Sequence, residues 1–378
     1  MSADIERLGY IDALRGYAIV GVIVVHVAQY VPDLEWPLDV WAVEGARGVQ
    51  LFFVASALTL MLSWHARADG IAAFYIRRVF RIAPMFWLAI PLYLALYGLG
   101  PRGSAPQGIS WPHIVTTAAF LHGFHPETIS SIVPGGSTIA VEMTFYAVFP
   151  LLAASLRSWQ SAALALGLAI CVAGLLYPAT IEIFHHLAPR ADNDLLKAFS
   201  YSWFPTQLPA FLVGILVFHL LREFRGVLAR GALRSGFAVA LAVPIVMPLI
   251  TGSMKILFVV YTLDFGVLAF CLAQGAGSRV LVNACIRYLG TISYSAYFWH
   301  FAALWALGPL GLDQFGHDSA VKWPYFVALL AGVFAVTVVL SSITYRCIEA
   351  PMIRLGRKVA ATAAVKSSVI RPSYRPAE

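Results

Sequence analysis

The sequence predicts an all-α polytopic membrane protein with about ten transmembrane helices and one short re-entrant segment. Hydrophobic residues make up 60% of its 378 residues and charged residues only 12%, whereas soluble domains carry about 25% charged residues. The apolar residues are gathered into runs of about 20, the length that a helix needs to span a bilayer. This composition excludes a soluble enzyme and a disordered protein, because too little polar surface remains to face water.

Ten apolar runs are the predicted transmembrane helices, at about 13–31, 46–64, 80–99, 138–156, 161–178, 207–221, 236–251, 256–274, 288–309 and 324–345. The first run follows charged residues and has no small-residue cleavage site after it, so we predict a retained helix and not a signal peptide. An eleventh stretch, from Trp111 to Phe124, is too short to cross comfortably. We predict that it enters the membrane and returns to the same side.

Basic residues are sorted between the loops on the two sides of this arrangement. With ten crossings, 20 of the 26 lysine and arginine residues lie on the side of the termini and 6 on the other. Cytoplasmic loops of membrane proteins are enriched in such residues. We therefore predict a multi-pass protein of the cytoplasmic (inner) membrane with both termini in the cytoplasm. The net charge of +7 is then topological, and we expect no nucleic-acid partner.

The four cysteines are scattered, without a CxxC pair or dense spacing. The sequence therefore predicts neither a disulfide framework nor a metal site.

A histidine lies inside the first predicted helix. Arg15 precedes His26 by eleven residues, which is close to three helical turns and a rise of about 16 Å, so both side chains leave the same face. Asp12 lies one turn below Arg15. Charged groups within a membrane span are costly and usually have a function or a partner. The alternative is a histidine that only packs and hydrogen-bonds to a neighbouring helix.

Glu142 lies within the fourth predicted helix, a few residues below the outer surface on this topology. It is therefore predicted at the same depth as His26. A carboxylate beside an imidazole orients the ring and stabilises its protonated form, as a general base requires. The alternative is a buried glutamate that is neutral or paired with an arginine.

Three arginines, Arg77, Arg78 and Arg81, begin the third predicted helix at the inner edge of the membrane. Arg78 and Arg81 share a face, and guanidinium groups suit bidentate binding of phosphate. The alternative is a topogenic cluster that extends to lipid headgroups.

The ninth predicted helix carries one polar stripe, formed by Ser293, Tyr297 and His300 at i, i+4 and i+7. These residues either line a polar tunnel or make hydrogen bonds between helices. Taken together, the cationic groups at the inner edge and the titratable groups in the outer half favour a phosphate-bearing donor from the cytoplasm and an acceptor from outside.

Six segments of the chain, in order, resemble the acyltransferase-3 family of integral membrane O-acyltransferases. They are "YIDALRGYAIVGVIVVHV" with Asp12, Arg15 and His26, "GVQLFFVASALTL", "RRVFRIAPMFW" with Arg78 and Arg81, "STIAVEMTFYAVFPLL" with Glu142 and Tyr146, "LGTISYSAYFWH" with Ser293, Tyr294, Tyr297 and His300, and "IEAPMIRLGRK" with Glu349 and Pro351. Two positions depart from the family pattern. Ala57 stands where the family has glycine, and Ser137 stands where it usually has tryptophan, so an aromatic platform for a sugar is missing there.

The resemblance implies an acyltransferase domain over residues 1–358. The composition of residues 359–378 is polar and basic, so we predict a cytoplasmic tail there that is disordered or lies along the membrane surface. It implies an acyl-CoA donor, with acetyl-CoA expected, and acceptor hydroxyls on a cell-envelope carbohydrate or glycolipid. His26 is then the catalytic base, with Glu142 and Asp12, and the alternative is that His26 itself carries the acyl group as a covalent acyl-histidine. Arg15, Arg77, Arg78 and Arg81 hold the coenzyme, and Ser293, Tyr294, Tyr297, His300 and Tyr146 bind substrate. Membrane lipid is an expected partner, and a homodimer is compatible with the sequence.

Two other functions remain open at this stage. Buried His, Glu and Asp residues are also typical of a proton-coupled transporter or exporter of a polar substrate. Inverted repeats in the sequence would favour a transporter, and the sequence does not show them. The second is a non-catalytic membrane subunit, in which replacing Arg78 or His26 would disturb only assembly.

Overall fold

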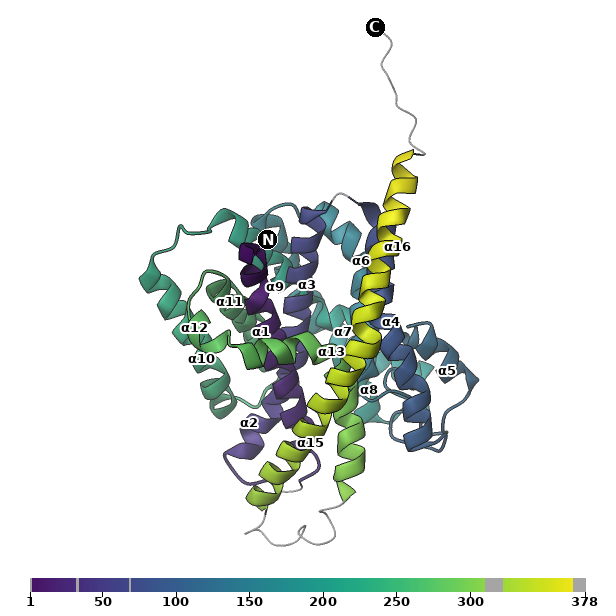
Figure 1. The fold of residues 1–378 in the computed structure, drawn as a ribbon. Helices are drawn as coiled ribbons and strands as arrows, with labels where there is room; N and C mark the ends of the chain where they lie inside the picture. The colour runs from purple at the N-terminus through teal and green to yellow at the C-terminus, as the bar shows by residue number, and fades with distance from the viewer. Residues whose placement is uncertain (1, 32–33, 68, 310–321, 370–378) are drawn as a thin grey trace.

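The computed structural model describes residues 2–31, 34–67, 69–309 and 322–369 (Figure 1), and they form a bundle of long helices. Ten long helices correspond to the ten predicted runs: α1 (Ser2–Ala28), α3 (Gly48–Ala66), α4 (Gly70–Tyr97), α6 (Gly136–Ser155), α7 (Trp159–Leu187), α9 (Phe204–Glu223), α10 (Arg230–Ile250), α11 (Met254–Ala273), α13 (Ala284–Leu307) and α15 (Lys322–Thr344). A π-helical turn, η4 (Tyr345–Glu349), joins α15 to α16 (Ala350–Val369). The remaining helices are short: α2 (Leu38–Glu44), η1 (Gly45–Arg47), α5 (Trp111–Ala118), η2 (His122–Phe124), α8 (Asn193–Ser202) and α12 (Ser278–Leu281).

Within the described residues, nine helical segments are long and apolar enough to cross a membrane. α13 corresponds to the ninth predicted span and is not among these nine segments; it carries the polar stripe and Arg287. The prediction of an all-α polytopic membrane protein is confirmed. α5 has only eight residues and is too short to cross, since a span needs about 20.

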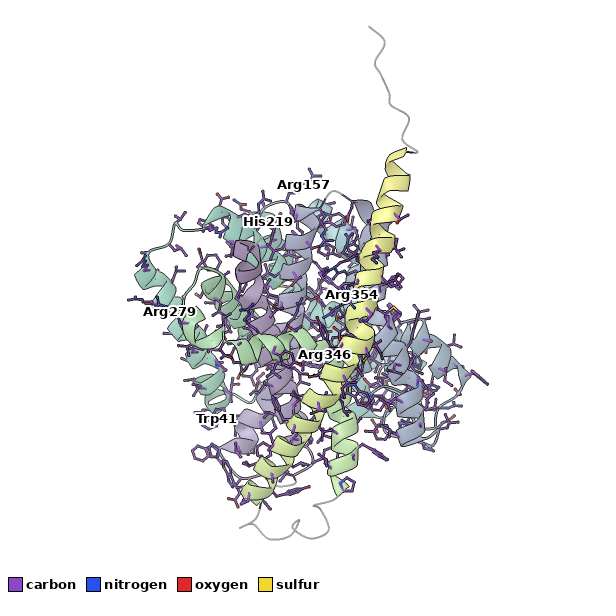
Figure 2. All side chains as sticks on the ribbon, in the orientation of Figure 1. Trp41, Arg157, His219, Arg279, Arg346 and Arg354 are labelled. Atoms are coloured by element: carbon purple, nitrogen blue, oxygen red, sulfur yellow. The ribbon has the colours of Figure 1, made fainter. Side chains whose placement is uncertain are left out.

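The start of α1 and the end of α16 lie at the same end of the bundle, as an even number of crossings requires (Figure 1). Arg157 lies at this end as well, and Trp41 lies toward the opposite end (Figure 2). α16 continues past the rest of the bundle and includes residues 359–369, the first part of the segment assigned to the tail. The last nine residues of that segment lie outside the described part of the chain.

The centre of the bundle is formed by α1, α3, α9 and α13. α1 packs against α13 and α3, and α9 packs against α3 and α7. The crossing of α1 and α13 is close at two glycines: a Cβ at Gly16 would overlap the Ile286 carbonyl oxygen, and one at Gly290 would overlap that of Asp12. Small residues let transmembrane helices approach in this way. The two helices that carry most of the predicted site residues are therefore held tightly together.

The outer helices present apolar side chains to their surroundings. Leu168 and Leu175 on α7 and Ile245 on α10 are more than half exposed. Large exposed apolar surfaces are unfavourable in water, but they suit helices that face lipid hydrocarbon. α7 and α10 are therefore lipid-facing helices, and the polar groups described next lie inside the bundle.

Candidate active site

Two adjacent cavities, each of about 660 Å³, lie among the central helices. The first, which we call the arginine cavity, is lined by side chains of α1, α3, α4, α6 and α13 and includes Arg15, Arg78 and Arg81. The second, which we call the histidine cavity, includes His26, Gln29 and Ser137. The common face of Arg15 and His26 that the helical period predicts thus leads into two neighbouring spaces.

Arg15 enters the arginine cavity from α1 and is held by two partners. Its Nη2 donates a hydrogen bond of 2.9 Å to Thr59 Oγ1 on α3. Its Nη1 lies 3.8 Å from a carboxylate oxygen of Asp12, one turn earlier on α1. Asp12 itself is not among the residues that line either cavity, so the structure places it as a partner of Arg15.

The arginines of α4 separate into two groups. Arg78 and Arg81 line the arginine cavity, whereas Arg77 is paired with Asp69 just before α4, with one contact of 2.9 Å from Nη2. α4 begins at Gly70, and Arg78 lies eight residues, or about 12 Å, along the helix from this first residue. The shared face predicted for Arg78 and Arg81 agrees with the structure, and Arg77 points elsewhere.

Arg78 keeps unused hydrogen-bonding capacity. Its guanidinium lies 5.8 Å from the ring centre of Tyr146 and 5.9 Å from that of Phe74. Its Nε is buried and makes no hydrogen bond to any residue in the described ranges. A buried donor without a partner is costly, so this group is suited to an anionic ligand such as a phosphate.

Arg81 is anchored by a carboxylate that is distant in sequence. It forms an ion pair with Glu349 of η4, and Ser295 of α13 donates a hydrogen bond of 2.7 Å to the same carboxylate. Glu349 is buried. The guanidinium of Arg81 also lies 5.7 Å from the ring centre of Tyr294. Three helical elements therefore fix the position of this one cation.

Glu142 lies in the arginine cavity and not beside His26. Its carboxylate accepts a hydrogen bond of 2.8 Å from the Ser56 hydroxyl and another from the Tyr146 hydroxyl. The side chain lines the arginine cavity and is not part of the lining of the histidine cavity. The predicted orientation of His26 by Glu142 therefore does not agree with the structure: similar depth on two helices does not bring two side chains together, because the rotation of each helix also counts.

His26 is oriented by Gln29, on the next turn of the same helix. The His26 Nδ1 and Gln29 Oε1 atoms are 3.0 Å apart. Because an amide oxygen can only accept, Nδ1 carries the proton and Nε2 keeps a free lone pair. The His26 ring packs against Phe301 at 4.5 Å and stacks on His300 at 5.3 Å between ring centres. The imidazole thus packs against two neighbouring rings of α13, in the tautomer that a general base requires.

His300 lies behind His26 and is fully buried. Its Nδ1 lies 3.1 Å from the Ala296 carbonyl oxygen, and its Nε2 has no hydrogen-bond partner among the described residues. His300 is not part of the lining of either cavity, so it contacts the site through His26. Ser293 and Tyr297, the other members of the polar stripe, do line the arginine cavity.

Three side chains line both cavities and form the wall between them: Phe53, Thr138 and Tyr297. The Tyr297 hydroxyl lies 2.8 Å from Thr138 Oγ1 and 3.1 Å from the Gly135 carbonyl oxygen, at the start of α6. Gly135 has a φ of 69°, which glycine adopts without strain. This turn directs the start of α6 toward Tyr297.

The segment before α6 supports this wall. The His122 ring stacks on Phe86 at 5.4 Å, and its Nε2 lies 2.9 Å from the Gly136 carbonyl oxygen. Burial lowers the pKa of His122, so the imidazole is neutral and donates to that carbonyl.

Several residues of the site were not predicted from sequence: Gln29, Ser56, Thr59 and the ion-pair role of Glu349. Tyr146 and Tyr294, which were predicted, line the arginine cavity, where the Tyr294 hydroxyl donates to the Ile82 carbonyl oxygen at 2.7 Å. Within the described ranges, no group of three or more His, Cys, Asp or Glu residues is placed to hold a metal ion. The side chains suit an anionic organic ligand instead.

Comparisons with known proteins show the family of the chain. The model of a family described as "Acyltransferase domain" matches residues 8–342. Among curated proteins, the exopolysaccharide production protein ExoZ of Rhizobium meliloti (strain 1021) is 27% identical over 337 residues, which is 84% of this chain and 93% of that protein. No solved structure matches the chain.

Proposed function

We propose a function from the premise that this chain belongs to the acyltransferase-3 family, whose model matches residues 8–342. The protein is a multi-pass membrane acyltransferase. It moves an acyl group, with acetyl expected, from acyl-CoA on the cytoplasmic side to a hydroxyl of a cell-envelope carbohydrate or glycolipid. The observation that carries this proposal is the wall shared by two cavities, with arginines on one side and an oriented imidazole on the other.

The arginine cavity is the proposed donor site. Arg15, Arg78 and Arg81 bind the phosphates of the coenzyme, since guanidinium groups pair with phosphate bidentately. The unpaired Nε of Arg78 supports this assignment. The positive-inside rule favours an inner-membrane protein with both termini in the cytoplasm, and the start of α1 and the end of α16 lie at one end of the bundle. The coenzyme then enters from the cell interior, and its thioester end extends toward the wall.

The histidine cavity is the proposed acceptor site. Its lining includes Ser137, Ser202 and Gln207 beside His26 and Gln29, and these side chains can hydrogen-bond sugar hydroxyls. Ser137 lies here although the family usually has tryptophan at this position, so polar contacts replace an aromatic platform. The name of the ExoZ relative, an exopolysaccharide production protein, supports a carbohydrate acceptor.

The proposed reaction is a direct transfer at the wall. His26 Nε2 removes the proton of the acceptor hydroxyl while the oxygen attacks the thioester carbonyl carbon. The new C–O ester bond forms, the C–S bond breaks, and the coenzyme leaves as a thiolate that then takes up a proton. General base catalysis of this kind contributes about 10²–10⁴-fold. Gln29 holds the ring in the required tautomer, and His300 and Phe301 hold its plane.

The other polar groups have positioning roles. Asp12 and Thr59 hold Arg15, and Glu349 holds Arg81. Glu142 joins Ser56 of α3 to Tyr146 within the donor site, and Ser293, Tyr294 and Tyr297 shape its inner surface.

The experiment is transfer of label from radioactive acetyl-CoA to envelope glycans in vesicles that contain the protein. We expect His26→Ala to lose about 10²–10⁴-fold of the transfer rate while it still binds coenzyme A. Transfer by His26→Ala at the rate of the parent would refute the assigned base. A parent protein that moves solute across proteoliposomes but acylates nothing would refute the enzyme in favour of a transporter.

A further inference from the structure

A third cavity of about 1040 Å³ lies beside the histidine cavity, between α7, α9 and α11. Ile170, Ala173, Pro209, Phe258 and Val259 give it a mainly apolar lining. Gly174 of α7 also lines it, and apart from its chain neighbours and the backbone of its own helix no described atom lies within 4 Å of the place that a Cβ would take. We call this space the side cavity.

The side cavity is bounded by a helix that faces lipid. On α7, Leu168, Val172 and Leu175 are exposed and flank the cavity residues Ile170, Ala173 and Gly174 in sequence. Gly174 is exposed as well. A hydrocarbon chain in the surrounding bilayer can therefore reach the cavity without crossing a polar surface.

Tyr201 connects the side cavity to the histidine cavity, because it lines both. Its ring meets Phe258 of the side cavity edge-on, with 6.1 Å between centres. Its hydroxyl accepts hydrogen bonds of 2.7 Å from both Arg47 Nη1 and Gln50 Nε2. One residue therefore presents an apolar ring to one space and is fixed by polar groups on its other side.

We propose that the side cavity holds the hydrocarbon chain of a lipid-linked acceptor, whose polar head extends past Tyr201 to His26. The inference rests on the proposed function and adds the substrate class: a saccharide carried on a membrane lipid, and not a free polysaccharide. An apolar space and a polar space that share one residue match a molecule with a chain and a polar head. The hydrophobic effect favours removal of a CH₂ group from water. A lipid chain that enters the cavity from the bilayer leaves hydrocarbon and not water, so it gains nothing from this effect. Its benefit here is to place the head next to the base.

The test uses a polyprenyl phosphate that carries a photoactivatable group on its chain, added to the intact protein in vesicles. After irradiation, mass spectrometry locates the labelled peptides. We expect labels on the lining residues of α7, α9 and α11. Labels spread evenly around the lipid-facing helices, or equal labelling of the lining by a photoactivatable phosphatidylethanolamine, would show ordinary bilayer lipid and overturn the proposal.

A matched pair of variants strengthens this test. Gly174→Trp places a large ring at the cavity, and Gly167→Trp places the same ring two turns earlier on α7, at a position that is equally open and does not line the cavity. We expect Gly174→Trp to reduce labelling of the lining about tenfold, because its ring fills part of the space that the chain would occupy, and Gly167→Trp to leave it unchanged. Equal labelling of the lining in the two variants contradicts the proposed chain site.

Coenzyme A binding separates this inference from the proposed function. The Gly174→Trp variant is expected to bind coenzyme A like the parent while it acylates the lipid-linked fraction of the envelope about tenfold more slowly. If the parent transfers acyl groups but acylates water-soluble glycans as fast as the lipid-linked fraction, the side-cavity inference fails and the acyltransferase stands. If the parent transfers no acyl group, the proposed function fails, and the labelling pattern still decides whether the cavity binds a lipid chain.

Discussion

Arg81 of α4 and Glu349 of η4 form an ion pair that joins segments 268 residues apart in the chain. The glutamate is buried, and Ser295 of α13 donates to its second oxygen. A buried carboxylate is stable only when it is paired and hydrogen-bonded. This pair therefore fixes Arg81 and also connects the last third of the chain to the arginine cavity.

Loss of the Glu349 carboxylate should destabilise the protein strongly. Breaking a buried pair by removing one partner costs about 3–5 kcal/mol, because the other charge is left uncompensated. We expect Glu349→Ala to unfold at a clearly lower temperature in detergent. The matched control is Asp69→Ala, whose pair with Arg77 is more exposed on the carboxylate side; exposed pairs contribute about 0.2–1 kcal/mol. Equal losses for the two variants would contradict this assignment of Glu349.

Arg78 and Arg77 are adjacent but should respond differently to substitution. Arg78→Gln removes a guanidinium that lines the donor cavity, so we expect the KM for acyl-CoA to rise by about tenfold to a hundredfold, the effect of 1.5–3 kcal/mol for bonds to a charged group. Arg77→Gln should leave the KM near that of the parent, because its partner is Asp69. Steady-state kinetics with varied acyl-CoA measures both, and a larger effect at Arg77 would place the donor elsewhere.

Gln29 should act on rate and not on donor binding. Gln29→Leu removes the acceptor for His26 Nδ1, and one hydrogen bond contributes about 1 kcal/mol, so we expect kcat to fall about five- to tenfold with the KM for acyl-CoA unchanged. Gln29→Glu keeps an oxygen acceptor and should restore most of the rate. A Gln29→Glu variant as slow as Gln29→Leu would show that orientation of the imidazole is not what Gln29 provides.

Close packing of α1 and α13 should make Gly290 sensitive to a single methyl group. In Gly290→Ala the new Cβ would overlap the Asp12 carbonyl oxygen, and overpacking of this kind costs about 1–3 kcal/mol. We expect a lower unfolding temperature and a lower acyl transfer rate, because α1 carries Arg15 and His26. The control is Gly167→Ala on α7, where the site is open and alanine should stabilise the helix by up to about 1 kcal/mol. A Gly290→Ala protein as stable and active as the control would contradict the close crossing.

Much of the fold was predictable from sequence because membrane spans are marked by local composition. The ten apolar runs correspond to ten long helices, and the eleven-residue spacing correctly places Arg15 and His26 on one face. The short helices α2 and α8 were not predicted, since each has ten residues or fewer and no apolar run of its own. The helical course of residues 359–369 was also missed, because their polar composition resembles a tail.

The site was predictable only in part, because it depends on contacts between helices. The period of a helix shows that Arg78 and Arg81 share a face, but not that Arg81 meets Glu349 from the other end of the chain. Likewise, the depth in the membrane that the sequence predicts suggested that Glu142 would meet His26. The rotation of α6 directs the Glu142 carboxylate to Ser56 instead. Gln29 carries no charge and lies at the end of the first helix, so nothing in its local sequence marked it as the partner of His26.

The wall of Phe53, Thr138 and Tyr297 also bears on the ion gradients across the membrane. An opening through the bundle wide enough for a bulky nucleotide would also pass ions and dissipate the proton-motive force. In the proposed reaction the thioester end meets the acceptor at this wall of three side chains, while the charged remainder of the coenzyme stays in the arginine cavity. Only the small acyl group then crosses to the other side of the membrane, so coenzyme A stays in the cytoplasm and can be acylated again.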